Sequence, residues 1–201
     1  MEPQISELFL YKNTLKFNEI EKKLKTRSNK LAYHLKKLIA KGILTKNEET
    51  YTLAEPAEHL IPYFSEKKAI LPVILIHIGD NKQAFLITRE KRPYKDLVSL
   101  PAGRILLGES PKQATQRIMK DKYGIKVTFK KINSISLEHV RKNKKIIHSF
   151  ILLFVSATTK ESFPLQNIQK QKSKTISSDY ALLTHDLKKK THLPTFNSKA
   201  M

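Results

Sequence analysis

The stretch from Gly103 to Ile125, GRILLGESPKQATQRIMKDKYGI, decides how the second half of this chain is interpreted. Glu109 follows Gly103 by six positions, Arg117 follows Glu109 by eight, and the stretch ends in Gly124-Ile125. Its second half predicts a helix, because a serine can cap the first turn, a proline is tolerated there and a glycine ends the last turn. A glycine loop that leads into a helix with a glutamate and an arginine at fixed spacing is typical of phosphate chemistry.

Apolar segments on both sides of this stretch indicate a sheet. The runs ILPVILIHIGD, QAFLITRE, KVTFKKINSISLEHV and KKIIHSFILLFVSAT are rich in β-branched residues and predict strands. The polar segment 158–178 is expected to be a loop, and a C-terminal helix is expected at about 179–190. A helix placed between strands of a mixed sheet predicts an α/β sandwich.

At about residues 69–157 the chain resembles the Nudix family of hydrolases, which act on nucleoside-diphosphate-linked substrates. The family box reads Gly, five residues, Glu, seven residues, then Arg-Glu-apolar-x-Glu-Glu-x-Gly-apolar. Gly103, Glu109, Arg117 and Gly124 occupy its framework positions here. The resemblance implies an α/β/α sandwich with a mixed sheet over residues 67–201, and a magnesium or manganese ion held by the box glutamates.

Three positions depart from that pattern. Where the family has glutamates, this chain has Ile118, Asp121 and Lys122. A hard divalent cation takes several oxygen ligands, and only Asp121 of the three is acidic. We therefore expect a degenerate box with no metal cofactor, in which Glu109 and Arg117 form an ion pair that fixes the loop against the helix.

Two readings of the pocket beside this box remain open. If the chain is a hydrolase, Asp121 and Glu138 are the carboxylates to hold Mg²⁺ or Mn²⁺ and act in catalysis, Asp121 being a weak metal candidate. If it is not, Arg89, Arg104 and Lys122 can bind an anionic ligand directly, with the Lys122 ammonium in place of the lost metal.

The first 66 residues predict a different domain. Their pattern is helix, helix, helix and hairpin, and it includes Leu35, Leu38, Gly42, Ile43, Leu44, Tyr51 and Leu53. This order resembles the winged helix-turn-helix domains of transcription regulators, which implies DNA binding through the third helix. The candidate DNA contacts lie on that helix and on the wing: Arg27, Ser28, Asn29, Lys30, Tyr33, Lys36, Lys37, Lys46 and Asn47.

The charge distribution supports a polyanionic partner. The net charge is +20; residues 1–66 carry 11 basic and 9 acidic residues (+2), and residues 67–201 carry 27 and 9 (+18). Such a field concentrates nucleic acids and nucleotides. The chain has no cysteine, which excludes disulfides and thiol nucleophiles. Because no leader pattern is present and the longest apolar run, residues 69–78, is too short to span a bilayer, we expect a cytoplasmic protein with no membrane partner.

The leading hypothesis is an α+β protein, with a winged helix-turn-helix at 1–66 and a degenerate Nudix domain at 67–201. It would regulate transcription by sensing a nucleotide-like small molecule or by forming a homodimer. In the fused Nudix regulators that it resembles, the winged helix follows the Nudix domain, whereas here it precedes it. A divergent metal-dependent Nudix hydrolase and a non-specific nucleic-acid-binding scaffold are the alternatives.

Overall fold

The computed structural model describes residues 1–64 and 69–198. The chain divides into two compact units, Met1–Ala69 and Ile70–Met201. In the described residues, no helix is long and apolar enough to cross a membrane.

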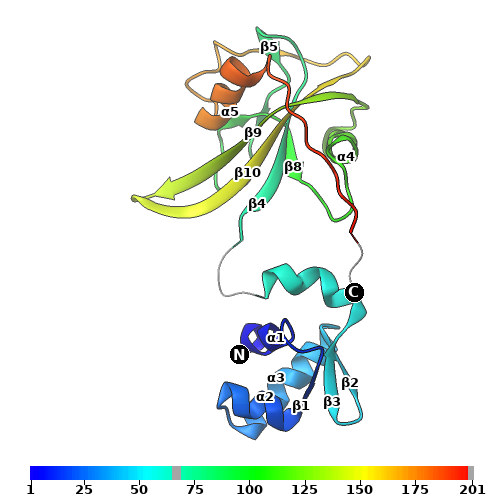
Figure 1. Ribbon diagram of the computed structural model, residues 1–201. Coiled ribbons are helices and arrows are strands. Elements are labelled where there is room, and N and C mark those ends of the chain that lie inside the picture. The colour runs from blue at the N-terminus through cyan, green and yellow to red at the C-terminus, as the bar shows by residue number, and fades with distance from the viewer. Residues whose placement is uncertain (65–68, 199–201) are drawn as a thin grey trace. The chain divides into compact units, whose positions relative to one another are not determined.

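The first unit combines helices with a small antiparallel sheet (Figure 1). Its elements are α1 (Glu2–Leu8), β1 (Thr14–Lys16), α2 (Phe17–Leu24), α3 (Ser28–Ala40), β2 (Leu44–Asn47), β3 (Thr50–Leu53) and a 3₁₀ helix (Glu55–Tyr63). In the sheet, β3 lies between β1 and β2.

Helix α3 forms where leucines recur at helical spacing. Leu31, Leu35 and Leu38 are buried in one core cluster, and they share it with Ile20 of α2 and Leu44 of β2. Residues three and four apart lie on the same side of a helix, so this spacing buries one face and leaves the opposite face exposed.

The start of α2 is set by the strand before it. The N-cap residue is Lys16, whose backbone N–H donates to the Glu19 carboxylate at 2.8 Å. Because Lys16 still pairs with Thr50 of β3, the chain leaves the sheet and enters the helix at this residue.

The second unit is built on a four-stranded mixed sheet in the order β8-β4-β10-β9. Strands β4 and β10 are parallel, and the other two pairings are antiparallel. The elements are β4 (Leu71–His77), β5 (Gln83–Ala84), β6 (Ile87–Thr88), β7 (Val98–Ser99), β8 (Ala102–Arg104), α4 (Pro111–Tyr123), β9 (Thr128–Lys142), β10 (Lys145–Thr158), β11 (Gln166–Asn167) and α5 (Ser177–Ala181). A π-helical turn, Leu182–Asp186, continues α5.

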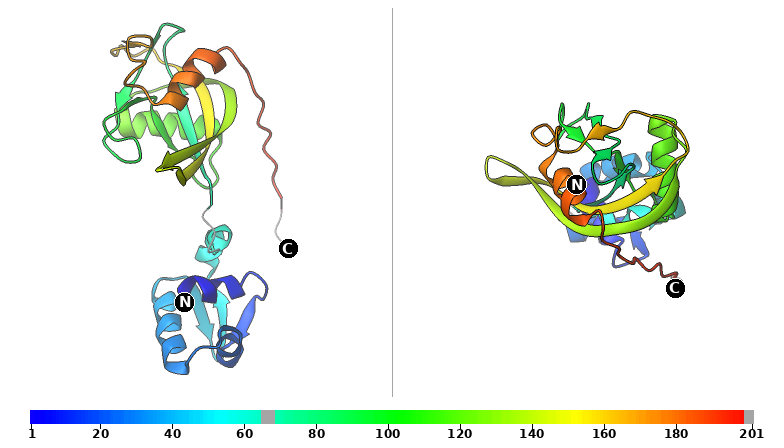
Figure 2. Two further views of the ribbon diagram at one scale, coloured as in Figure 1. Left: turned by 90° about the vertical axis from the view of Figure 1, so that its left-hand side faces the viewer. Right: turned by 90° about the horizontal axis from the view of Figure 1, so that it is seen from above.

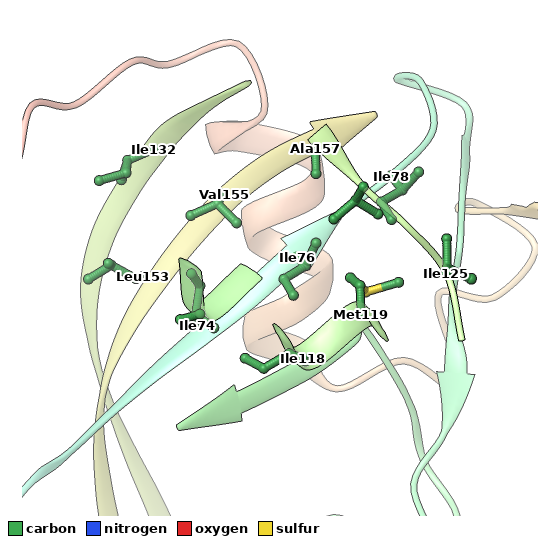
Figure 3. Packing of buried hydrophobic residues seen from close by; sticks show 12 residues of the cluster. Ile74, Ile76, Ile78, Ile118, Met119, Ile125, Ile132, Leu153, Val155 and Ala157 are labelled. Atoms are coloured by element: carbon green, nitrogen blue, oxygen red, sulfur yellow. The ribbon is translucent and has the colours of Figure 1, made fainter. Parts of the chain in front are cut away.

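Alternating side chains of β4 and β10 pack into two hydrophobic cores, one on each face of the sheet. Ile74, Ile76, Leu153 and Val155 face α4, where Ile118 and Met119 complete the cluster shown in Figure 3. Leu75, Leu152 and Phe154 point to the opposite face, against Leu182 and Leu183. The central strands are therefore apolar on both faces, as expected for a sheet that is covered on both sides.

Two elements differ from the sequence prediction. The segment QAFLITRE, expected as one strand, is divided into β5, which pairs with β11, and β6, which pairs with β7. The C-terminal helix ends at Asp186 rather than near 190. Beyond it, Thr191 donates to the Ile132 carbonyl at 2.9 Å, so the chain there runs along β9.

Candidate functional site

The loop before α4 is fastened to the helix by one arginine. The Arg117 guanidinium donates to both carboxylate oxygens of Glu109, one of them at 2.8 Å, and to the Arg104 carbonyl at 3.0 Å. Glu109 also accepts from the Leu106 N–H at 2.9 Å. The hydrogen bond from Arg117 lowers the pKa of Glu109, so this carboxylate stays charged and remains bonded to Arg117 and the loop. The ion pair expected from the sequence is present.

The ends of α4 are also held by local hydrogen bonds. Ser110 accepts from the Gln113 N–H at 3.3 Å, and the Gln113 side chain accepts from the Ser110 N–H at 2.9 Å, which completes a capping box. At the other end Gly124 has φ = +69°, a left-handed conformation that glycine adopts at little cost. The predicted cap and stop of this helix are confirmed.

Gly103 and Ile118 meet where the strand β8 passes α4. A Cβ placed on Gly103 would lie 2.7 Å from Ile118 Cδ1, closer than a real contact permits. Ile118 is fully buried in the core beneath α4. The isoleucine at the position of a family glutamate is thus a packing residue, and no carboxylate can be supplied from there.

Lys122, one turn further along α4, lines a cleft of about 720 Å³. Its Nζ donates to the Ala102 carbonyl at 2.6 Å. Of the described residues that line this cleft, four are cationic (Arg89, Lys91, Arg104 and Lys122) and one, Glu90, is acidic. We call it the basic cleft. Partial desolvation, followed by the charges of Arg89, Arg117, Lys91 and Arg104, lowers the pKa of Lys122.

Arg89 lines both the basic cleft and a smaller pocket beside it. Within the described chain its Nε–H is buried and has no hydrogen-bond partner. A buried donor left unpaired costs about 1–3 kcal/mol, more when it is charged. An acceptor on a bound ligand would remove that cost.

A smaller apolar pocket of about 70 Å³ adjoins the basic cleft and shares Val73, Arg89 and Ala102 with it. Two acids, Glu138 and Asp179, line this pocket. Glu138 accepts from the Tyr94 hydroxyl at 2.9 Å and the Ser178 hydroxyl at 2.6 Å. The pocket therefore presents hydrogen-bonding groups within apolar walls.

Asp179 is 3% exposed and accepts from the Leu100 N–H at 2.8 Å. Burial raises its pKa to about 7, and the nearby charge of Glu138 acts in the same direction. Burial, together with the hydrogen bond to Glu138, also raises the pKa of Tyr94. Near neutral pH the Asp179 carboxyl can therefore either hold or release a proton.

Residues 70–190, more than half of the chain, match the family described as the NUDIX domain. The chain belongs to the Nudix family. No curated protein matches it.

Solved Nudix structures resemble the chain at low sequence identity. A NUDIX hydrolase from Nitrosomonas europaea has a TM-score of 0.50 and 14% identity, covering 59% of this chain and 88% of that one. A MutT protein from Bacillus halodurans has a TM-score of 0.47 and 18% identity, covering 60% and 84%. The NUDIX domain of Shewanella oneidensis NrtR, solved with ADP ribose, has a TM-score of 0.46 and 14% identity, covering 67% and 96%. At 14% identity, the likeness to the Nitrosomonas europaea structure shows the fold alone.

Nudix proteins commonly use Mg²⁺ or Mn²⁺, but the side chains of this box do not fit such an ion. Ile118 is in the core, Glu109 is bound to Arg117, and the Lys122 ammonium lies beside the strand that the box packs against. Across residues 1–64 and 69–198, no group of three His, Cys, Asp or Glu side chains is arranged to hold a metal ion.

The sequence-predicted residues of the second unit are only partly brought together. Arg89, Arg104 and Lys122 line one cleft. Asp121 is exposed on α4 and, in the described chain, does not line either pocket that Glu138 lines. The carboxyl beside Glu138 is instead Asp179, which sequence reasoning missed along with Tyr94 and Ser178. The serine pair that begins α5 was a local signal for Ser178 and Asp179, but not for Tyr94.

In the first unit, the candidate DNA contacts are all exposed, but some have partners within the chain. On α3, Asn29, Lys30, Tyr33 and Lys36 face solvent. Lys37 pairs with Glu2 at 3.0 Å, and the Ser28 hydroxyl donates to Glu21. On the hairpin, Lys46 Nζ lies 5.9 Å from the centre of the Tyr51 ring, and Asn47 is exposed at the end of β2.

Proposed function

We propose that this chain is a DNA-binding regulator whose Nudix unit binds a phosphorylated, nucleotide-type ligand without hydrolysing it. The observation that carries the proposal is the convergence of Arg89, Arg104 and Lys122 on the basic cleft. Arginine and lysine are the side chains that hold phosphate oxygens, arginine through two parallel hydrogen bonds and lysine as a point charge. In this proposal Lys122 takes over the neutralising role of the family's cation.

The two adjoining pockets favour a ligand with two ends. A phosphate group suits the basic cleft, where none of the described residues supplies an acceptor for the Nε–H of Arg89. A hydrogen-bonding edge of the ligand, such as an amino or N–H group, suits the small apolar pocket, where Glu138 and Asp179 can accept hydrogen bonds. Nucleotides combine these two chemistries.

The ligand proposal is tested by thermal shift with nucleoside monophosphates, nucleoside diphosphates and nucleotide sugars, each in EDTA and in Mg²⁺. A ligand at about 100 times its Kd stabilises the folded state by about 2.7 kcal/mol. We expect at least one compound to raise Tm by several degrees equally in both buffers, and Lys122→Gln to remove the shift. Lys120→Gln, on the same helix but outside the cleft, is the matched control. A shift that requires Mg²⁺, or that survives Lys122→Gln, contradicts the proposal.

The DNA-binding role rests on the first unit. Its helix order, its three-stranded sheet and the exposed face of α3 support a winged helix-turn-helix, in which α3 enters the major groove. The test is a gel shift on the region upstream of the chain's own gene. Binding should be tighter there than on random DNA, and this preference should be lost in the triple variant Asn29→Ala, Lys30→Ala, Tyr33→Ala. Equal affinity for both DNAs would favour a non-specific scaffold.

The pair Glu138 and Asp179 favours a second candidate function. A carboxyl with a pKa of about 7 is suited to general acid–base catalysis, so a divergent hydrolase is the alternative. Release of monophosphate from nucleoside-diphosphate substrates would support it if Asp179→Asn abolishes the activity. Loss through Asp121→Ala instead would indicate the metal site that the sequence had suggested.

A further inference from the structure

A long two-stranded hairpin extends from the sheet of the second unit (Figures 1 and 2). Strands β9 and β10 stay paired from Thr128 and Thr158 to Lys142 and Lys145. The neighbouring strand β4 reaches only as far as Phe150 of β10. Within the described residues, the end of the hairpin is therefore a two-stranded ribbon with no third strand paired to it.

The end of this ribbon is sharply turned and basic. Asn143 and Lys144 have φ of 49° and 64°, the two left-handed residues of a tight hairpin turn. The hairpin tip, which we define as residues 141–145, contains Arg141, Lys142, Lys144 and Lys145, all exposed. In the described part of the chain, none of these four forms a salt bridge, and the nearby Glu138 is occupied by Tyr94 and Ser178.

The positive charges at the tip destabilise the hairpin locally. Lys142 and Lys145 lie directly opposite each other in the strand register, and like charges in that position destabilise a hairpin. An anionic partner would relieve the repulsion, and the fixed turn would hold the cations in place for it. The tip is thus better suited to a polyanion than to solvent alone.

The order of residues along the ribbon favours DNA over a membrane. The extreme end is Lys-Asn-Lys-Lys, whereas the exposed apolar residues Leu137 and Ile146 lie behind it. Apolar insertion into a bilayer would require the charged end to enter first, which is costly. The major groove of B-DNA, in contrast, admits a two-stranded ribbon, and lysine and arginine bind the phosphates along its edges. We propose that the hairpin tip binds the phosphate backbone of double-stranded DNA, as a contact separate from that of the first unit.

The experiment uses the full chain and a random-sequence duplex, with fluorescence anisotropy measured across a salt series. The tip variant carries Lys142→Gln, Lys144→Asn and Lys145→Gln, where asparagine suits the left-handed residue 144. The control variant carries Lys112→Gln, Lys120→Gln and Lys160→Gln, which removes the same charge from exposed positions elsewhere. Both are compared with wild type and with the α3 triple variant, and circular dichroism with thermal melting checks that each folds.

Each phosphate contact contributes about 0.9 to the slope of log K against log salt. We expect the tip variant to lose about two to three units of slope and at least about 10-fold in affinity at low salt, while the control changes affinity less than about 3-fold. The loss should persist in the background of the α3 triple variant, which separates it from the proposed role of the first unit. Equal losses in the tip and control variants, or an unchanged slope in the tip variant, would overturn the proposal. So would tip-dependent binding to phosphatidylserine vesicles without tip-dependent binding to DNA.

Discussion

Gly103 and Ile118 illustrate how one substitution constrains its neighbour. With Ile118 in the core, the strand β8 passes so close to α4 that residue 103 has no room for a side chain. Ile118 stands where the family has a glutamate after the arginine, and its side chain fills the space beside residue 103. The glycine at residue 103 therefore has a packing role in this chain.

We predict that Gly103→Ala lowers the free energy of unfolding of the second unit by about 1–3 kcal/mol, the usual range for overpacking. Adding Ile118→Val should recover part of the loss, because it removes Cδ1, the atom nearest to the new Cβ. Urea unfolding of the two variants and of Ile118→Val alone gives the coupling energy. Strictly additive effects would show that the two residues do not meet.

Asp179 predicts a pH dependence of stability. Its folded pKa of about 7 is above the ordinary value of 3.8, so between about pH 4 and 7 the folded state holds a proton that the unfolded chain has released. Stability contributed by this proton is therefore lost as pH rises through that window, with a slope of at most about 1.4 kcal/mol per pH unit. The free energy of unfolding of Asp179→Asn minus that of wild type should increase from pH 4.5 to pH 7.5. A difference that is flat or of opposite sign would show that Asp179 is ionised throughout.

The candidate site was predictable in part at this scale. Lys122 and Arg104 could be named because the box spacing fixes where they stand relative to Gly103. Asp179 could not, since its environment depends on a hydrogen bond from Leu100, 79 positions earlier in the chain. No periodicity in the sequence encodes that approach.

Among the elements, α4 and the loop before it act together. Arg117 joins them through Glu109 and the Arg104 carbonyl, and Arg104 itself lines the basic cleft. The position of Arg104, a proposed ligand contact, thus depends on a helix residue that does not line the cleft.

We predict that Arg117→Lys weakens binding of inorganic pyrophosphate about 3- to 10-fold, although residue 117 does not line the cleft. Lysine cannot form the paired hydrogen bonds that the Arg117 guanidinium makes with Glu109, so the loop that carries Arg104 would be held less firmly. Isothermal titration in EDTA measures the affinity. Hydrogen exchange should show faster exchange at Leu106 and Glu109, whose N–H groups bond within this loop. Wild-type affinity together with faster exchange would mean that the loop does not position Arg104.

Local signals decided which elements could be predicted. The cap, the stop and the apolar face of α4 all lie within fifteen residues, from Ser110 to Gly124, and the structure contains each of them. The division of QAFLITRE could not be foreseen, because β5 and β6 pair with different distant strands. Strand partners are a non-local choice, and alternation along one segment does not reveal it.

At the scale of the whole molecule, the charge is concentrated in the unit that belongs to the Nudix family, which carries most of the net +20. Part of that charge surrounds the basic cleft, part is on the hairpin tip, and the remainder is dispersed over exposed faces. We propose different partners for the cleft and the tip: a small phosphorylated molecule for the cleft and a long polyanion for the tip.

If the proposed regulator is correct, the ligand and the DNA must affect each other's binding equally. A ligand that changes the affinity for the upstream DNA by a given factor requires that this DNA change the affinity for the ligand by the same factor. Couplings of this kind are typically 5- to 150-fold. We predict a factor in this range for the nucleotide that produces the largest metal-independent thermal shift.

Calorimetric titration of that nucleotide with and without the duplex, and of the duplex with and without the nucleotide, gives both factors. Lys122→Gln should eliminate the coupling while leaving DNA affinity in the absence of nucleotide unchanged. If neither ligand changed the affinity for the other, the Nudix unit would bind its ligand without regulating DNA binding by the first unit.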